Sequence, residues 1–218
     1  MDNDKAKLTA ITIKKFKSFD SETKIDLAPL TVIVGRNNSG KSTLIQGLLL
    51  LKQTLADPRS DMMLGLEGML DAFSLREITF GRPPQAPLVN GPIIALEWES
   101  EVNVTKALSD ASSPDLENLT KHSGITWFKN PPGSRSVKTS IKLHTVEVDG
   151  VAEISSIELR SINEDNSPTI KIKKSESSWC CFWNDKHATQ IQVELDHFIP
   201  YLKINRSAVG PRDRQRAL

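Results

Sequence analysis

Residues 30–44 read Leu-Thr-Val-Ile-Val-Gly-Arg-Asn-Asn-Ser-Gly-Lys-Ser-Thr-Leu, and this stretch decides the fold. Its centre matches the P-loop pattern G-x-x-x-x-G-K-[S/T] at every fixed position. Gly35 and Gly40 carry no Cβ, so the backbone can turn tightly and approach a phosphate group. The backbone N–H groups that follow would form an anion-binding nest. Lys41 would contact the β- and γ-phosphates, and the Ser42 hydroxyl would be a ligand of Mg²⁺.

The segments on either side of the loop support this interpretation. Residues 30–34 form a short apolar run rich in β-branched side chains, which predicts a buried parallel strand. Apolar residues then recur at helical spacing, which predicts a helix buried over much of its circumference. These residues are Leu44, Ile45, Leu48, Leu49, Leu51 and Leu55. The sequence therefore predicts a nucleotide site formed by Gly35, Arg36, Asn37, Asn38, Ser39, Gly40, Lys41, Ser42 and Thr43.

Composition limits the class of protein. The 218 residues are 38% hydrophobic and 25% charged, which is ordinary for a soluble globular chain. A net charge of +1 does not require a nucleic-acid partner. The sequence has no run of about 18 apolar residues, so we expect no membrane span. Residues 1–5 are too polar for a signal peptide, and we expect a cytoplasmic location.

Strand patterns dominate the chain outside the predicted helix. Two antiparallel strands are expected at 8–16 and 23–27, ahead of the P-loop. Further strands are expected at 92–100, 124–129, 136–148, 152–162, 167–174, 178–184 and 188–195. Asp149-Gly150 predicts a type I′ hairpin turn. We expect a nucleotide-binding lobe at 1–90, an antiparallel β-rich subdomain at 91–200 with a polar excursion at 105–121, and a basic return segment at 201–218.

The two cysteines are adjacent and make a poor disulfide. Neighbouring strand residues point to opposite faces, so we expect one of Cys180 and Cys181 inside and the other outside. With His187 they do not complete a four-ligand metal site.

Two stretches together resemble a known family. They are Ile-x-x-Phe-Lys-Ser-Phe at residues 13–19 and the P-loop stretch with its flanks at 30–53. They resemble the ABC-type ATPase heads of the SMC, RecF and OLD group, and are most similar to prokaryotic OLD-like and Septu-like AAA family ATPases. Many of those act in defence against phage. The resemblance covers residues 8–56. It is specific for the ATPase class and less specific for the biological role.

The resemblance implies an α/β P-loop NTPase lobe with a parallel or mixed sheet around the P-loop helix and an attached antiparallel β-subdomain. It implies ATP and Mg²⁺ as ligands, with the turn at Lys14, Lys15, Phe16 and Lys17 near the adenine and ribose. Phe16 is out of phase with Ile11 and Ile13 and is equally consistent with a core position. Gln85 is either the glutamine of a Q-loop or part of a proline-rich surface loop. Gly210-Pro211-Arg212 resembles the return from the subdomain to the core.

Several parts of a complete ATPase head are not found in the sequence. The family's Walker B strand, signature turn and switch histidine do not follow in order. Residues 93–97 end in Glu without a preceding Asp and are better explained as a structural strand. We therefore expect the N-terminal part of a head, with its C-terminal half absent or supplied by another chain. Such a chain would bind ATP but would not hydrolyse it efficiently by itself.

Several functional classes stay open. The first is an ATPase that dimerises around ATP and gates a nuclease or other effector, in phage defence or DNA maintenance. Alternatives are an ATP-binding scaffold without turnover and a DNA repair ATPase of the RecF or SMC type. A small P-loop kinase would need alternating strands and helices, and a GTPase would need Asn-Lys-x-Asp. Lys171, Lys173, Lys174 and the arginines of 206–216 would contact DNA or RNA, or form a solvated or interface surface.

Overall fold

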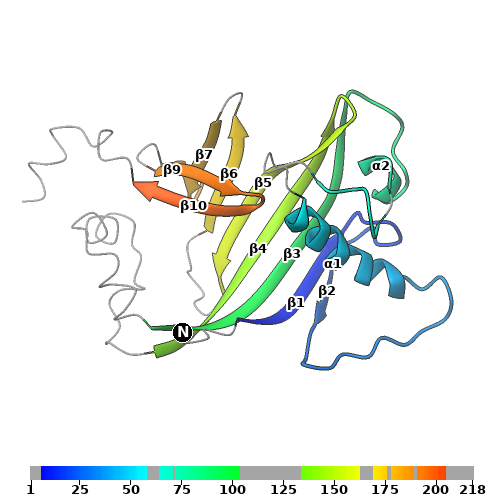
Figure 1. Ribbon diagram of the computed structural model, residues 1–218, viewed down its shortest axis with the longest axis horizontal. Helices are drawn as coiled ribbons and strands as arrows, with labels where there is room; N and C mark the ends of the chain where they lie inside the picture. Colours follow the sequence, from blue (N-terminus) through cyan, green and yellow to red (C-terminus); the bar gives the residue numbers. More distant parts are fainter. Residues whose placement is uncertain are drawn as a thin grey trace, which may run out of the picture.

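The structure is a computed structural model that describes residues 6–57, 64–70, 72–103, 134–162, 169–175, 178–188 and 191–204. One sheet of eight strands runs in the order β2-β1-β3-β4-β5-β6-β7-β8, and β10-β9 forms a separate hairpin (Figure 1). The strands are β1 (Lys7–Lys14), β2 (Thr23–Asp26), β3 (Leu88–Asn103), β4 (Ser134–Val148), β5 (Val151–Ser161), β6 (Thr169–Ser175), β7 (Ser178–Trp183), β8 (Lys186–His187), β9 (Ile191–Asp196) and β10 (Ile199–Ile204). The helices are α1 (Lys41–Ala56) and α2 (Leu75–Ile78).

Alternation of side chains explains the large sheet. Ile11 and Ile13 on β1 face the core, fully buried, and pair with the apolar β3 residues Leu96 and Ile94, while Ala10 and Thr12 between them are buried as well. The β4–β5 hairpin turns at Asp149 and Gly150, whose φ angles of 50° and 83° confirm the predicted type I′ turn. Cys181 is buried and Cys180 is partly exposed, which confirms that the adjacent cysteines face opposite sides.

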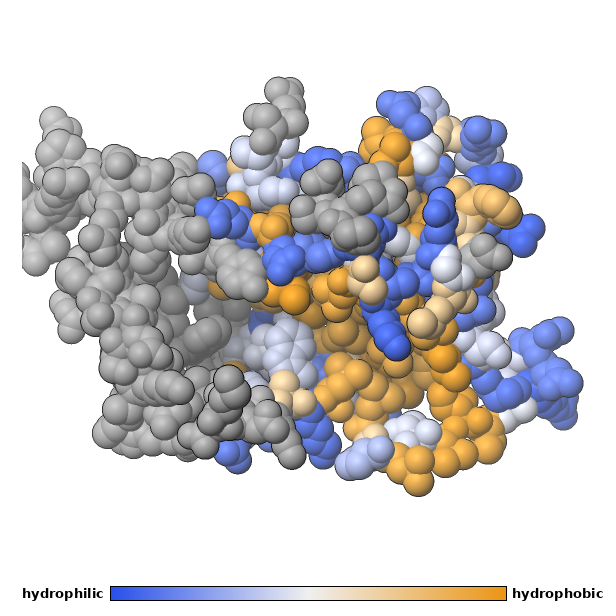
Figure 2. All heavy atoms as spheres, viewed as in Figure 1, coloured by the Kyte–Doolittle hydropathy of each residue, from blue (hydrophilic) through white to orange (hydrophobic). Residues whose placement is uncertain are grey.

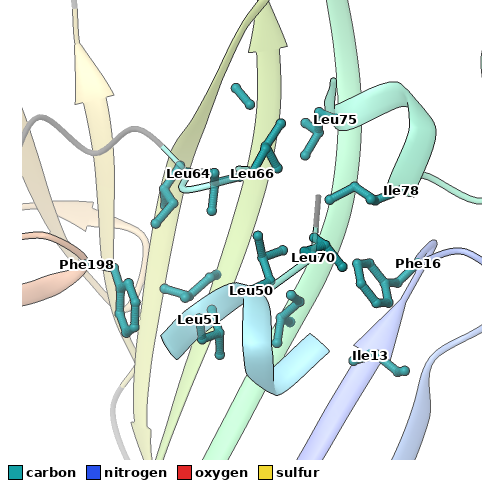
Figure 3. Packing of buried hydrophobic residues seen from close by; sticks show 14 of the residues in the cluster. Ile13, Phe16, Leu50, Leu51, Leu64, Leu66, Leu70, Leu75, Ile78 and Phe198 are labelled. Atoms are coloured by element: carbon teal, nitrogen blue, oxygen red, sulfur yellow. The ribbon is translucent and has the colours of Figure 1, made fainter. Parts of the chain in front are cut away.

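A second layer covers one face of the sheet. It consists of α1, α2, the segment 64–70 and the β9–β10 hairpin (Figure 1). Leu50 and Leu51 of α1, Leu75 of α2 and Phe198 of the hairpin meet in one hydrophobic core, drawn in Figure 3. The sheet contributes Ile11, Ile13, Ile94, Ile141, Leu143, Ile154, Ile157 and Ile172 to the same core. One apolar face of α1 therefore fixes the helix against the sheet.

The opposite face of the sheet is polar and carries paired charges. Lys24 Nζ lies 2.6 Å from Glu97 Oε1, and Lys142 lies 3.4 Å from Glu22. Lys171, which the sequence left open as a nucleic-acid contact, lies 3.4 Å from Glu158 and 3.5 Å from Asp185. Positive charge on this face is largely balanced by carboxylates, which is typical of a solvated sheet face.

The predicted parallel or mixed sheet around the P-loop helix is wrong for the described residues, because every strand pair is antiparallel. The predicted buried strand at 30–34 is also wrong: this segment is in no sheet. Leu30, Val32 and Val34 are 82%, 74% and 85% exposed. A parallel strand is stable only between neighbours, and none of the described strands pairs with this segment. Figure 2 shows apolar atoms on the lower right, where Figure 1 draws this segment.

The predicted helix is present as α1 but is less buried than expected. Leu44, Leu50 and Leu51 are buried, whereas Ile45 and Leu55 are 53% and 42% exposed. Ile45 and Leu55 are exposed for the same reason as segment 30–34: no described residues pack against their side of the helix.

The sheet continues across the expected domain boundary near residue 90, because β1 pairs directly with β3. The three-part division of the chain stays a prediction. The expected excursion at 105–121, the strand at 124–129 and the arginines of 206–216 lie outside the described residues. Within the described ranges, no helix has the length and apolar character needed to cross a membrane.

Candidate phosphate-binding site

The site is built at the N-terminus of α1, which is the longest helix described. Residues 35–40 lead into the helix, and Gly40 is its N-cap with φ 87° in the left-handed region. No side chain caps the helix, and its first turn carries no acidic residue. The N–H groups of this turn, at the positive end of the helix dipole, are therefore available to an anion.

The local geometry favours glycine at both positions of the loop, most strongly at Gly40. A Cβ on Gly40 would lie 3.0 Å from Ser18 Oγ and 3.1 Å from the Phe19 ring, in addition to the strain of the positive φ. A Cβ on Gly35 would lie 2.8 Å from Ser39 Oγ. A side chain at either position would therefore crowd the loop, which is the property that a P-loop needs for close approach of a phosphate.

Lys41 is folded over the loop. Its Nζ donates hydrogen bonds to the carbonyls of Gly35, at 2.7 Å, and Arg36, at 2.5 Å. The ammonium group therefore lies beside the loop backbone, where it can form a charge-assisted hydrogen bond to a phosphate oxygen. Ser42 is exposed beside it, so its hydroxyl is accessible to a metal ion. Asn37 and Asn38 are exposed at the tip of the loop.

The turn after β1 forms the wall behind the loop. Phe16 and Phe19 exchange two backbone hydrogen bonds of 2.9 Å, and Phe16 is fully buried in the core. Lys17 N donates to Ile78 O at 2.8 Å, and Phe80 N donates to Lys15 O at 2.9 Å. Backbone hydrogen bonds therefore join the turn to the last residue of α2 and to the segment that follows it.

Two further side chains of this turn, besides Phe16, lie against the start of the P-loop helix. Ser18 Oγ donates to Thr43 Oγ1 at 3.2 Å, and the Phe19 ring lies against Gly40. Burial lowers the pKa of Lys17, although the nearby Glu77 carboxylate opposes the shift. Lys17 is therefore half-buried under the turn rather than projecting freely.

The residues predicted to lie near the adenine and ribose differ in burial. Phe16 takes the core position that the sequence left open, so its ring presents no free face to a base. Lys15 is exposed, and Lys14 is half-buried. The sequence reasoning missed Ser18 and Phe19, although both stand in the Ile-x-x-Phe-Lys-Ser-Phe stretch that carried the resemblance. Gln85 lies in an exposed loop between α2 and β3, as the surface-loop alternative expects.

Residues 93–97 are part of β3 and do not supply a catalytic carboxylate. Leu96 faces the core, so Glu97 projects from the opposite face of the sheet, where both carboxylate oxygens accept from Lys24 at 2.6 and 2.8 Å. Among the described residues, no strand of apolar residues ends in an Asp-Glu pair. The site thus has the groups needed to hold phosphate but lacks, in the described part, a carboxylate pair for hydrolysis.

A family model for the AAA ATPase domain matches residues 7–208. The chain belongs to the AAA ATPase domain family. Membership in this family implies a P-loop NTPase. The glycine-rich loop that leads into the uncapped N-terminus of α1 agrees with that implication. A search of the curated proteins found no match.

Proposed function

We propose that this AAA ATPase domain binds ATP together with Mg²⁺ at residues 35–43. The observation that carries the proposal is the cradle at the start of α1. An uncapped helix N-terminus, a left-handed Gly40 that admits no side chain and the Lys41 ammonium group converge on one loop. Each of these favours a phosphorylated ligand, and together they match the P-loop spacing.

Within this site each group has a separate task. The loop and first-turn N–H groups hold phosphate oxygens, and Lys41 exchanges the carbonyls of Gly35 and Arg36 for them. The Ser42 hydroxyl is the group that would ligate Mg²⁺, and the bound cation offsets the negative charge of the triphosphate. None of these groups positions or deprotonates a water molecule, which hydrolysis requires.

We further propose that polypeptide other than the residues described here completes the ATPase head. The exposed apolar segment 30–34 and the exposed Ile45 and Leu55 of α1 support this proposal, because both would be buried if further strands paired beside the segment. A complete head would dimerise around ATP and gate a nuclease or other effector, as in OLD-like and Septu-like systems of phage defence, or in DNA maintenance. An ATP-binding scaffold without turnover is the second candidate, because the described residues lack the catalytic carboxylates.

Isothermal titration with ATP and Mg²⁺ tests the first proposal. Lys41→Ala should weaken binding about ten- to a hundredfold, because a charge-assisted hydrogen bond to phosphate is lost. Lys52→Ala is the matched control, since Lys52 is an exposed lysine on the same helix, about three turns from the loop. Equal ATP affinity in the Lys41→Ala variant and the wild type would refute the assignment.

Measuring ATP hydrolysis by the 218 residues distinguishes three cases: an incomplete ATPase head, a scaffold without turnover, and a chain that is active by itself. We expect background ATPase activity from this chain and restored activity when the complementary part of a head is added. A scaffold would stay inactive in both cases. Strong Lys41-dependent turnover by the chain alone would show that a catalytic carboxylate lies within it.

A further inference from the structure

The turn after β1 reaches the helix that carries the phosphate cradle through one polar contact. Ser18 Oγ donates to Thr43 Oγ1 at 3.2 Å, across 25 residues of sequence. Thr43 lies in the first turn of α1, directly after Ser42, and is 9% exposed. The contact therefore joins the turn to a hydroxyl at the base of the cradle.

This pair of hydroxyls can leave the Thr43 proton free, because each hydroxyl both donates and accepts. Thr54 and Thr79 donate their hydroxyl protons to the carbonyls four residues earlier, Leu50 and Leu75, both at 2.8 Å. The Thr43 hydroxyl instead pairs with that of Ser18 at 3.2 Å and has no other partner in the described part of the chain, so its proton is free when Ser18 donates. A hydroxyl that accepts one hydrogen bond still donates its own proton, and the acceptor role strengthens that donation.

The position of Ser18 is set from outside the loop. Backbone bonds of 2.8–2.9 Å join Lys17 to Ile78 and Lys15 to Phe80, while the Phe16 side chain is buried in the core. Phe19 on the same turn lies against Gly40, where a Cβ would meet its ring at 3.1 and 3.2 Å. The sheet and the segment after α2 thus hold the turn in place, and the turn holds the base of the cradle.

We propose that Ser18 is a positioning residue for the nucleotide: it holds the Thr43 hydroxyl so that its remaining proton points to a phosphate oxygen. Ser18 itself does not touch the nucleotide, and the Phe19 ring keeps Gly40 in its left-handed conformation from behind. This inference rests on the proposed ATP site. It assigns a role in phosphate binding to a residue outside the P-loop motif.

A double-mutant cycle tests the route through Thr43. ATP affinity in the presence of Mg²⁺ is measured by isothermal titration for Ser18→Ala, Thr43→Val, the double variant and Ser18→Thr. Ser18→Ala should weaken ATP binding about three- to tenfold, as expected for one hydrogen bond, and Ser18→Thr should restore it. In the Thr43→Val background, Ser18→Ala should have no further effect. Ser21→Ala is the matched control, because Ser21 is exposed just after this turn and, among the described residues, its hydroxyl has no partner while its carbonyl accepts from Thr23 Oγ1.

A purely structural role would give a different result. It would lower the thermal midpoint of the nucleotide-free Ser18→Ala variant and leave the ATP affinity unchanged, which overturns the proposal. An equal loss of affinity in the Thr43→Val background would also overturn it, because Ser18 would then act without Thr43. If the wild type binds no ATP and Lys41→Ala changes nothing, the proposed function fails, and this inference with it. If the wild type binds ATP and Ser18→Ala binds it equally well, only the inference about Ser18 fails and the proposed ATP site stands.

Discussion

Gly91 offers the sharpest test of how the second layer is packed on the sheet. It lies in β3 at a bulge, between the paired residues Asn90 and Ile93. A Cβ built on Gly91 would lie 2.7 Å from Leu75 Cγ and 2.5 Å from Thr145 Oγ1, and it would also collide with Leu75 Cδ2. Gly91→Ala therefore forces α2 away from the sheet or distorts the bulge.

The cost can be estimated from the contacts that must change. Inserting a methyl group into a packed core costs about 1–3 kcal/mol. Moving Leu75 also strains the hydrogen bond from Leu75 N to Glu147 Oε2, 2.7 Å long, and the loss of one such bond adds about 1 kcal/mol. We expect Gly91→Ala to lower the free energy of unfolding by about 2–4 kcal/mol.

Gly47→Ala is the matched control, because it adds the same methyl group under the same layer. Gly47 lies within α1, and its Cβ would meet Ile13 Cγ2 at 3.4 Å, an ordinary to slightly tight contact. Replacing a glycine inside a helix by alanine gains about 1 kcal/mol of helix propensity. Gly47→Ala should therefore be neutral or stabilising, in contrast to Gly91→Ala.

Urea unfolding followed by tryptophan fluorescence measures both variants, since Trp98 and Trp179 pack against the core. Leu75→Ala removes the obstruction at a cost of about 2–5 kcal/mol, and adding Gly91→Ala to it should cost little more. Full additivity of the two changes, or a Gly91→Ala variant as stable as Gly47→Ala, would refute the packing described for α2.

The remaining predictions concern the C-terminal end of α1 and the exposed segment 30–34. The pKa of His197 is raised because its ring bonds the Asp57 carbonyl at 2.7 Å and the Asp196 carboxylate at 2.8 Å. Its contribution to stability is therefore full below the ordinary histidine pKa, near 6.5, and is lost as the pH rises through the raised value. The thermal midpoint of the wild type minus that of His197→Asn, which tolerates the positive φ of 56°, should therefore shrink as the pH rises through this range; a difference that does not change with pH would contradict this. Val32→Lys should change the free energy of unfolding of this chain by less than about 0.5 kcal/mol, because Val32 is 74% exposed, but should block completion of the sheet by a partner; a loss above about 1 kcal/mol would show that Val32 is already packed.

Local chemistry made much of this protein predictable from sequence. The P-loop is read from fixed residue types at fixed spacing, because a phosphate cradle needs two glycines, a lysine and a hydroxyl within eight positions. The strands that became β1, β4 and β5 followed from alternation, and the turn between β4 and β5 followed from Asp149-Gly150. Each of these patterns depends only on residues close together in the chain.

Tertiary structure alone decided which segments meet. An apolar run such as 30–34 has the composition of a buried strand, but only the presence of neighbouring strands determines whether it is paired, and the described residues provide none. The pairing of Ser18 with Thr43 and of His197 with Asp57 joins residues 25 and 140 positions apart. Such contacts depend on strand register and bulges, where a shift of one residue turns every side chain to the other face. The sequence therefore predicts the phosphate-binding loop, and the fold shows which residues lie behind that loop.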